Sequence, residues 1–249
     1  MKKMNRTEFL KIGTMAALSP LFVKATANEF TAPIDTVMMN RLLAANDKTA
    51  SQLMESVKPG NLRFSRMIAY DIAVLTAAYC AKGSAFYHNS EVVNKIDVLT
   101  KFLASAQSED GTVNVGNLES PPDTAFVIEI LCPAAEILKK EKAKDVDAIN
   151  QQLKEIILKA GEGLVVGGVH TPNHRWVISA ALSGINSLYP NKKYIDRIND
   201  WLDEGVFIDE DGHYPERSGI YSGVENAAFI TIARLANKSS LYAPVRRNL

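Results

Sequence analysis

Apolar residues that recur every three or four positions dominate the sequence. One such stripe consists of Phe64, Ile68, Ile72, Leu75 and Tyr79. This spacing places the side chains on one face of an α-helix. The same pattern recurs along the chain and predicts about eight helices, near 34–57, 62–81, 90–106, 123–141, 145–161, 173–188, 191–204 and 222–237.

The predicted loops are alternately short and long. Short connections join consecutive helices as antiparallel hairpins. Longer connections, rich in Gly, Pro, His and Asn, span 107–122, 162–172 and 205–221. We therefore expect an all-α fold of antiparallel helical hairpins, with the long loops gathered at one end. Short extended pieces at 112–115 and 165–166 and a kink at Pro133 are further expectations.

Two segments about a hundred residues apart resemble each other. Each has an Asp-Gly turn, at 110–111 and 211–212, then a polar loop, an acidic residue and an apolar helix. Asp-Gly favours a tight turn because Gly accepts positive φ. The similarity has two explanations: common turn chemistry, or stacked hairpins of one type that form an α/α toroid or solenoid.

The N-terminal segment has the features of an export signal. A basic stretch precedes an apolar run at 12–23, and Ala25-Thr26-Ala27 fits an A-x-A cleavage site. The segment 5–11 is similar to a twin-arginine signal, although Thr7 replaces the second arginine. We expect 1–27 to be removed and 28–249 to form one domain in the periplasm or outside the cell, without stable membrane insertion. The alternative is an amphipathic first helix of the domain.

The charge balance excludes some classes of partner. The chain has 28 basic and 28 acidic residues, and removal of 1–27 leaves 23 basic and 27 acidic residues. No nucleic-acid partner is expected from this balance. An anionic substrate would have to be attracted by residues of the loops. Cys80 and Cys132 both lie in apolar helical stretches, which favours buried free thiols over a disulfide.

The polar segment 167–176 precedes a predicted helix. Either Thr171 or Asn173 could cap this helix. Asn173 and His174 would then lie on its first turn, where backbone amides and the helix dipole favour an anion. The alternative is helix capping alone, with Trp176 packed in the core.

A zinc site is a second possibility for this segment. His170 and His174 are four residues apart, which would put both on one face of a helix. Pro172 lies between them and argues against a continuous helix. A histidine pair with His213 or Glu216 stays open as an alternative, but we assign neither a metal nor a cofactor.

The loop 211–223 is glycine-rich and carries many reactive side chains. Such loops often face a ligand, because a rigid scaffold positions them. Tyrosine and arginine suit the recognition of sugars and carboxylates. A third element is Asp123, for which helix capping is the expected role and a place in the wall of the same cleft the functional one. The candidate side chains of the loop are His213, Tyr214, Glu216, Arg217 and Tyr221.

These motifs resemble those of the α/α-toroid polysaccharide lyases, the heparinase II/III and chondroitin/alginate lyase group. The similarity covers roughly 100–249 and depends on Asn173-His174-Arg175-Trp176 and on the 211–221 loop. It implies β-elimination on a uronic-acid polysaccharide, with Asn173 and His174 neutralising the C5 carboxylate. Tyr221 or Tyr214 would act as base and acid, and Arg217 would bind a carboxylate. The remaining expected substrate-binding residues are Glu216, His213, His170, Trp176 and Asp123.

The chain differs from this family in two ways. A six-hairpin toroid needs about twelve helices, and such lyases usually carry C-terminal β-domains that are not visible here. We therefore expect a partial toroid, and 243–249 reads like the start of another element. Two other functions remain open: a glycoside hydrolase using Asp123, Glu216 or Glu225 as paired carboxylates, and a non-catalytic carbohydrate-binding protein.

Overall fold

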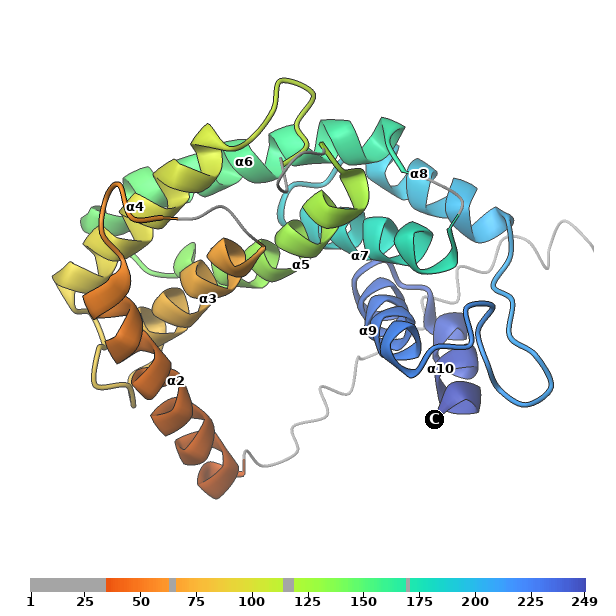
Figure 1. The fold of residues 1–249 in the computed structure, drawn as a ribbon, viewed down its shortest axis with the longest axis horizontal. Helices are drawn as coiled ribbons and strands as arrows, with labels where there is room; N and C mark the ends of the chain where they lie inside the picture. The colour runs from red at the N-terminus through yellow and green to blue at the C-terminus, as the bar shows by residue number, and fades with distance from the viewer. Residues whose placement is uncertain (1–34, 63–65, 114–118, 169–170) are drawn as a thin grey trace, which may run out of the picture. The chain divides into compact units, whose positions relative to one another are not determined.

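A computed structural model describes residues 35–62, 66–113, 119–168 and 171–249 (Figure 1). The chain divides into two compact units, 1–39 and 40–249, and only 35–39 are described in the first. The predicted export signal at 1–27 lies outside the described residues. Helix α2 begins at Thr36 in the first unit and continues into the second, which holds the other helices.

Nine α-helices occur in the described ranges, with one isolated β-bridge between Gln107 and Val113 and no strand in those ranges. The prediction of an all-α fold is confirmed. The eight predicted helices are all present, although α3 begins five residues later than expected and α6 continues five residues further. The helices are α2 Thr36–Ser56, α3 Met67–Cys80, α4 Ser90–Ser105, α5 Pro121–Leu138, α6 Asp147–Val166, α7 Pro172–Leu188, α8 Lys192–Asp203, α9 Gly219–Leu235 and α10 Tyr242–Asn248.

The helices of the second unit pack in two layers (Figure 1). In the first layer α3, α5, α7 and α9 pack side by side in chain order. In the second layer α4 lies against α3, α6 against α5 and α8 against α7, while α10 packs on α9. Apolar side chains such as Ile128, Leu153, Val177 and Ile198 are completely buried in the core. Consecutive helices therefore form hairpins, and the first-layer helices all point the same way.

The two Asp-Gly segments form the same turn. In the first, Ser108 N donates to Thr112 O at 2.8 Å and Gly111 N donates to Ser108 O at 3.0 Å. The second repeats this pattern, with Asp209, Gly212 and His213 in the equivalent places, at 3.0 and 3.1 Å. Both glycines have positive φ, +91° and +85°. The similarity of the two sequences therefore reflects equivalent turns before α5 and α9.

Two local expectations differ from the structure, and a third agrees with it. Val165 and Val166 are not extended but end helix α6. Asp123 does not cap α5, because the hydroxyl of Ser120 takes that place and accepts from the Asp123 backbone N–H at 3.3 Å. The element expected at 243–249 is α10, which begins one residue earlier.

The two cysteines are free thiols, and Cys132 is buried while Cys80 is half-buried. Burial raises the pKa of the Cys80 thiol to about 12, so it stays protonated at neutral pH. The expectation of free thiols in apolar helices therefore agrees with the structure.

In the described part of the chain, no helix combines the length and the apolar character needed to cross a bilayer.

Substitution of Gly111 tests the importance of the equivalent turns. A Cβ at Gly111 would collide with the carbonyl oxygen of Lys159 in α6, and φ is +91°. We expect Gly111→Ala to lower the free energy of unfolding by about 3 kcal/mol or more. Gly205 also has positive φ, +89°, but nothing lies within 4 Å of the place that a Cβ would occupy there. Gly205→Ala should therefore cost only about 1 kcal/mol. Urea unfolding measures both, and equal losses would contradict the packing role of Gly111.

Candidate functional site

The first turns of four helices surround one cavity. The cavity has a volume of about 510 Å³ and lies where α3, α5, α7 and α9 begin. It brings together four residues predicted from the sequence: Asp123, Asn173, His174 and Tyr221. The other lining residues are Arg66, Met67, Tyr70, Phe126, Ile220 and Val224.

Helix capping sets the register of the polar residues in this cavity. Ser120, Thr171 and Ser218 are the N-caps of α5, α7 and α9. The residue three positions after each cap lines the cavity, which places Asp123, His174 and Tyr221 at equivalent positions. The hydroxyl of Ser218 accepts from the backbone N–H of Tyr221 at 3.4 Å, and Ser120 does the same for Asp123. Thr171 makes no such side-chain hydrogen bond, so the three side chains share their position relative to the helix start and two of them share the cap.

The cavity contains the positive ends of four helices, one arginine and one aspartate. Helix N-termini carry partial positive charge and unsatisfied N–H groups. Arg66 adds a full positive charge, with a guanidinium nitrogen 3.6 Å from a carboxylate oxygen of Asp123. Its guanidinium also lies 4.9 Å from the centre of the Phe126 ring. About half of the Arg66 side chain is exposed, so it can reach a ligand that enters from solvent.

A hydrogen bond connects the 205–218 loop to α7. The side-chain nitrogen of Asn173, a residue only 3% exposed, donates to both carboxylate oxygens of Glu216 at 2.7 and 2.8 Å. An ionised carboxylate only accepts, so the NH₂ side of the amide must face Glu216. Glu216 therefore fixes the orientation of the Asn173 side chain at the edge of the cavity.

The imidazole of His174 lines the cavity together with Asn173 and Tyr221. Its Nδ1 atom is buried and has no hydrogen-bond partner among the described residues. Tyr221 is 45% exposed, so its phenol is open to solvent and to a ligand. The cavity thus offers an amide, an imidazole and a phenol together.

A second carboxyl lies one helical turn behind Tyr221. Glu225 in α9 is completely buried, and neither of its oxygens has a hydrogen-bond partner among the described residues. Burial, and to a lesser extent the charge of Glu216, raise the pKa of Glu225 to about 7, while Arg175 opposes the shift. Glu225 lies in α9 of the first layer, but its side chain does not line the cavity.

Other predicted residues lie away from the cavity. Tyr214 is 1% exposed, and its hydroxyl donates to Asn226 Oδ1 at 2.7 Å. Trp176 is 2% exposed and its ring lies 4.9 Å from that of Phe229. Burial raises the pKa of the Tyr214 phenol, which stays neutral at physiological pH. Both aromatic residues therefore belong to the core between α7, α9 and the 205–218 loop.

The two basic residues of the loop, Arg217 and His213, do not line the cavity either. Arg217 has φ of +47° and pairs with the carboxylate of Asp209 in the same turn. His213 is exposed, and its backbone N–H donates to Asp209 Oδ1 at 2.8 Å. His170 lies outside the described residues. Among the described residues, no group of three or more potential ligands is arranged to hold a metal ion.

A groove continues from the cavity along the first layer. It has a volume of about 540 Å³ and shares Tyr70, Phe126, Ile220 and Val224 with the cavity. Its far end is lined by later turns of α5, α7 and α9, which include Glu129. Burial raises the pKa of Glu129 to about 8. The groove is therefore mostly apolar, with a neutral carboxyl in its wall at neutral pH.

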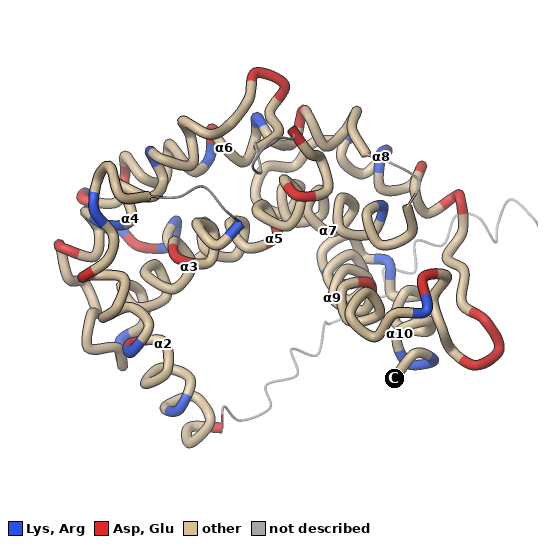
Figure 2. The backbone as a smooth tube through the Cα atoms, viewed as in Figure 1, with Lys and Arg blue, Asp and Glu red and all other residues tan. Residues whose placement is uncertain are grey.

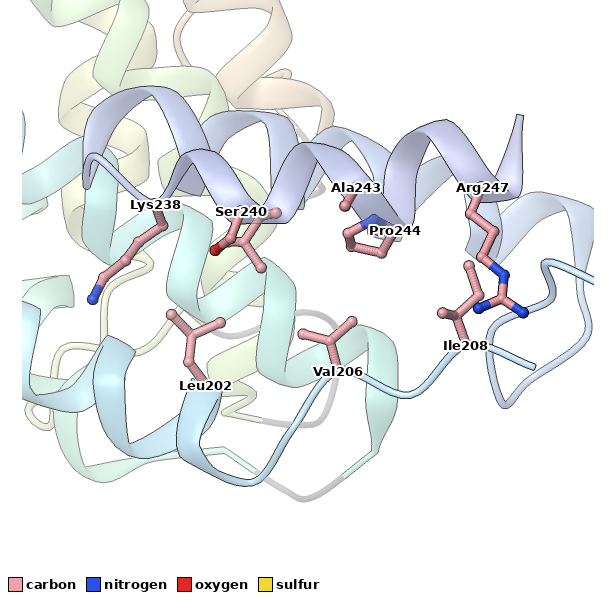
Figure 3. Close-up of a pocket in the computed structure, with 9 residues that line it drawn as sticks. Leu202, Val206, Ile208, Lys238, Ser240, Ala243, Pro244 and Arg247 are labelled. Atoms are coloured by element: carbon pink, nitrogen blue, oxygen red, sulfur yellow. The ribbon is translucent and has the colours of Figure 1, made fainter. Parts of the chain in front are cut away.

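A third cavity, of about 530 Å³, lies between the end of α8 and α10 (Figure 3). Its middle is formed by apolar side chains such as Val206 and Pro244, with Lys238 and Arg247 at its two ends. Lys238 already donates to Asn199 Oδ1 at 2.7 Å. None of the residues predicted from the sequence lines this cavity, so it is not the candidate site.

Sequence reasoning missed part of the wall. Arg66, Tyr70 and Ile220 line the cavity but belong to no recognisable motif. Arg66 directly precedes α3, so a search for charged residues at the starts of alternate helices would have found it. The Ile220 side chain is 80% exposed, and it reaches the wall of the cavity because α9 packs beside α7.

Comparison of the chain with protein-family models and with curated proteins gave no match. The case for a function therefore depends on the geometry of the cavity and on the motifs of the sequence. Lys and Arg are interspersed with Asp and Glu along the described helices (Figure 2).

Glu129 provides a test of the groove through pH dependence. Its pKa is about 8 in the folded chain against 4.5 for an exposed glutamate. Because the folded state holds this proton more tightly, the contribution of Glu129 to stability is greatest below pH 4.5 and decreases as pH rises towards 8. Between acid and alkaline pH, the free energy of unfolding should fall by about 2–4 kcal/mol less in Glu129→Gln than in the wild type. Urea unfolding at acid and alkaline pH measures it, with the exposed Glu136→Gln as control. An unchanged pH dependence in Glu129→Gln would contradict burial of this carboxyl.

Proposed function

We propose that this chain is an exported polysaccharide lyase that cleaves a uronic-acid-containing polysaccharide by β-elimination at the cavity of Asn173, His174 and Tyr221. The observation that carries the proposal is the presence of an amide, an imidazole and a phenol in one cavity at four helix N-termini. Export is supported by the signal-like features of 1–27, and the enzyme would act in the periplasm or outside the cell.

The first requirement of the reaction is neutralisation of the substrate carboxylate. The C5–H of a uronate becomes acidic only when the adjacent carboxylate is neutralised, since the intermediate carries an additional negative charge. His174 and the N-terminus of α7 can donate hydrogen bonds to that group, and Arg66 adds a positive charge. The Asn173 amide, which donates to Glu216 in this structure, would do so after turning away from Glu216. Arg66 would take the role that the sequence suggested for Arg217. Both arginines pair with an aspartate, Arg66 with Asp123 and Arg217 with Asp209, but Arg66 lines the cavity and Arg217 does not.

The second requirement is proton transfer. Tyr221, as the phenolate, would take the proton from C5. The electron pair of the C5–H bond then forms the C4=C5 double bond while the C4–O bond breaks. The departing oxygen leaves with the electrons of that bond and takes the proton back from Tyr221. The choice of Tyr221 over Tyr214 is supported by exposure, 45% against 1%, and by the hydrogen bond of Tyr214 to Asn226.

The proposal also covers the arrangement of the helices. We infer that the two layers are consecutive hairpins of a partial (α/α) toroid. Support comes from the parallel first-layer helices and from the equivalent turns at 108–112 and 209–213. In such a fold the ends of the first-layer helices would form the sugar-binding cleft, with the groove beside Glu129 as its continuation.

A glycoside hydrolase is less well supported. That chemistry needs two carboxyl groups on opposite sides of a glycosidic bond. Of the three carboxylates considered, Asp123 alone lines the cavity. Glu225 is completely buried, and Glu216 is bound by Asn173. A non-catalytic carbohydrate-binding protein would bind sugar in the same cavity without cleaving it. An activity assay therefore distinguishes the lyase, the hydrolase and the binding protein.

The assay measures the ultraviolet absorbance of the unsaturated uronate that elimination creates, with alginate, chondroitin and heparan as probes. We expect Tyr221→Phe and His174→Ala to lower the rate by about 10²–10⁴-fold, because each removes a group that acts in the transition state. Tyr214→Phe is the matched control: it removes a buried phenol hydroxyl and should reduce stability but not the elimination rate.

Three results would contradict the lyase proposal. Release of reducing ends without the absorbance would indicate a hydrolase, and binding without either signal would indicate a carbohydrate-binding protein. Wild-type rates in both Tyr221→Phe and His174→Ala would remove these residues from the mechanism. Circular dichroism of each variant checks that the fold is retained.

A further inference from the structure

The cavity between the end of α8 and α10 takes no part in the proposed function. Its volume of about 530 Å³ lies within the range of about 300–1000 Å³ that is typical of small-molecule sites. Three parts of the chain form it: the end of α8 with the 205–208 segment that follows, the short 3-10 helix η2 at Ser239–Leu241, and α10. It shares no lining residue with the cavity of Asn173 and His174.

The middle of this cavity is apolar. Figure 3 shows Leu202 and Val206 on one side of it. Ala243 and Pro244 face them from α10 on the other side. Leu202, Val206 and Pro244 are half-buried, and Ala243 is exposed, so a ligand placed between them removes apolar surface from water. The middle of the cavity therefore suits an apolar chain.

A positive charge lies at each end of the cavity. Lys238 is at one end and Arg247 at the other (Figure 3). The ammonium group of Lys238 donates to Asn199 Oδ1 at 2.7 Å, and this neutral partner leaves its charge uncompensated. Neither Lys238 nor Arg247 forms an ion pair with a described residue. Because an ammonium group and a guanidinium each carry several donors, both side chains keep donors for a ligand.

Among the described residues, no acid lines this cavity. Glu204 and Asp209 flank the 205–208 segment in the sequence. The first pairs with Arg175 at 2.9 Å and the second with Arg217. Both charges in the wall are therefore positive and are not balanced by carboxylates of the described chain. Charge complementarity favours a ligand with two anionic groups.

We propose that this cavity binds an aliphatic dicarboxylate, with one carboxylate at Lys238, the other at Arg247 and the apolar chain of the ligand between them. A ligand with one anionic end would leave one cation unused, and a neutral ligand would leave both. Lys238 contributes more than Arg247, because it is half-buried and water screens an exposed charge more strongly. The inference is independent of the proposed function, since it concerns other residues and its test uses no polysaccharide.

Isothermal titration calorimetry of the full chain with adipate, suberate and sebacate measures this binding. The three dicarboxylates differ only in the length of the apolar chain. We expect the affinity to depend on that length, because both carboxylates must reach cations at fixed places. Octanoate and octanediol have as many carbon atoms as suberate but lack one or both of its charges. Each should bind about tenfold more weakly than suberate, or more weakly still.

Variants locate the ligand on the chain. Lys238→Met and Arg247→Met each remove one charge but keep a long side chain, and each should weaken suberate binding by about tenfold. The larger loss is expected for Lys238→Met. Arg246→Met is the matched control and should bind suberate nearly as the wild type does, because Arg246 is exposed on α10 and does not line the cavity. Ala243→Asp adds a negative charge to the middle of the cavity and should abolish binding.

Three results would overturn the inference. The first is the absence of binding of all three dicarboxylates at millimolar concentrations. The second is binding of octanoate or octanediol as tight as that of suberate, which would indicate an apolar site in which the cations have no role. The third is wild-type affinity for suberate in both Arg247→Met and Ala243→Asp. These two substitutions are at exposed positions, so the test does not depend on the folding of Lys238→Met, which loses the hydrogen bond to Asn199.

Discussion

The parallel packing of α3, α5, α7 and α9 is the constraint on which the site depends. Each first-layer helix packs against the next one along the chain, and a second-layer helix returns the chain between them. All four helices consequently begin at one end, where their first turns surround a single cavity. The N-terminus of a single helix carries only a weak partial positive charge, and here four such charges lie at the same place. The layer arrangement, more than any single loop, therefore brings the candidate site together.

The helices could be predicted well from the sequence, and the site in part. Apolar periodicity is a local property, so it defined eight helices and the all-α class without knowledge of the tertiary packing. It did not identify α10 as a helix, because that element is short and its buried residue is Val245 alone. Asp123, Asn173, His174 and Tyr221 were found because polar residues at helix starts are also local signals. Arg66 and Tyr70 were missed because their place in the cavity depends on how α3 packs beside α5.

Residue type alone did not separate Tyr214 from Tyr221, or Arg217 from Arg66. Both tyrosines lie in the same polar segment, but Tyr214 belongs to the turn that packs under α9, and its ring centre is 5.7 Å from that of Phe229. Tyr221 is three positions after an N-cap and is exposed at the cavity. The direction of a side chain in an irregular loop depends on turn geometry, and the positive φ of Arg217 is one such case. Sequence periodicity carries no information about that direction.

The Asp-Gly turns connect the fold to the site. Gly212 lies against the carbonyl of Arg247 in α10, just as Gly111 lies against that of Lys159 in α6, so each turn is fixed on a second-layer helix. After the second turn, the loop needs only a few residues to reach Glu216 and then the cap at Ser218. The Asn173–Glu216 hydrogen bond therefore joins α7 to a loop that is itself anchored on α10. The loop that carries Glu216 is therefore held on both sides, by Gly212 against α10 and by the Ser218 cap of α9.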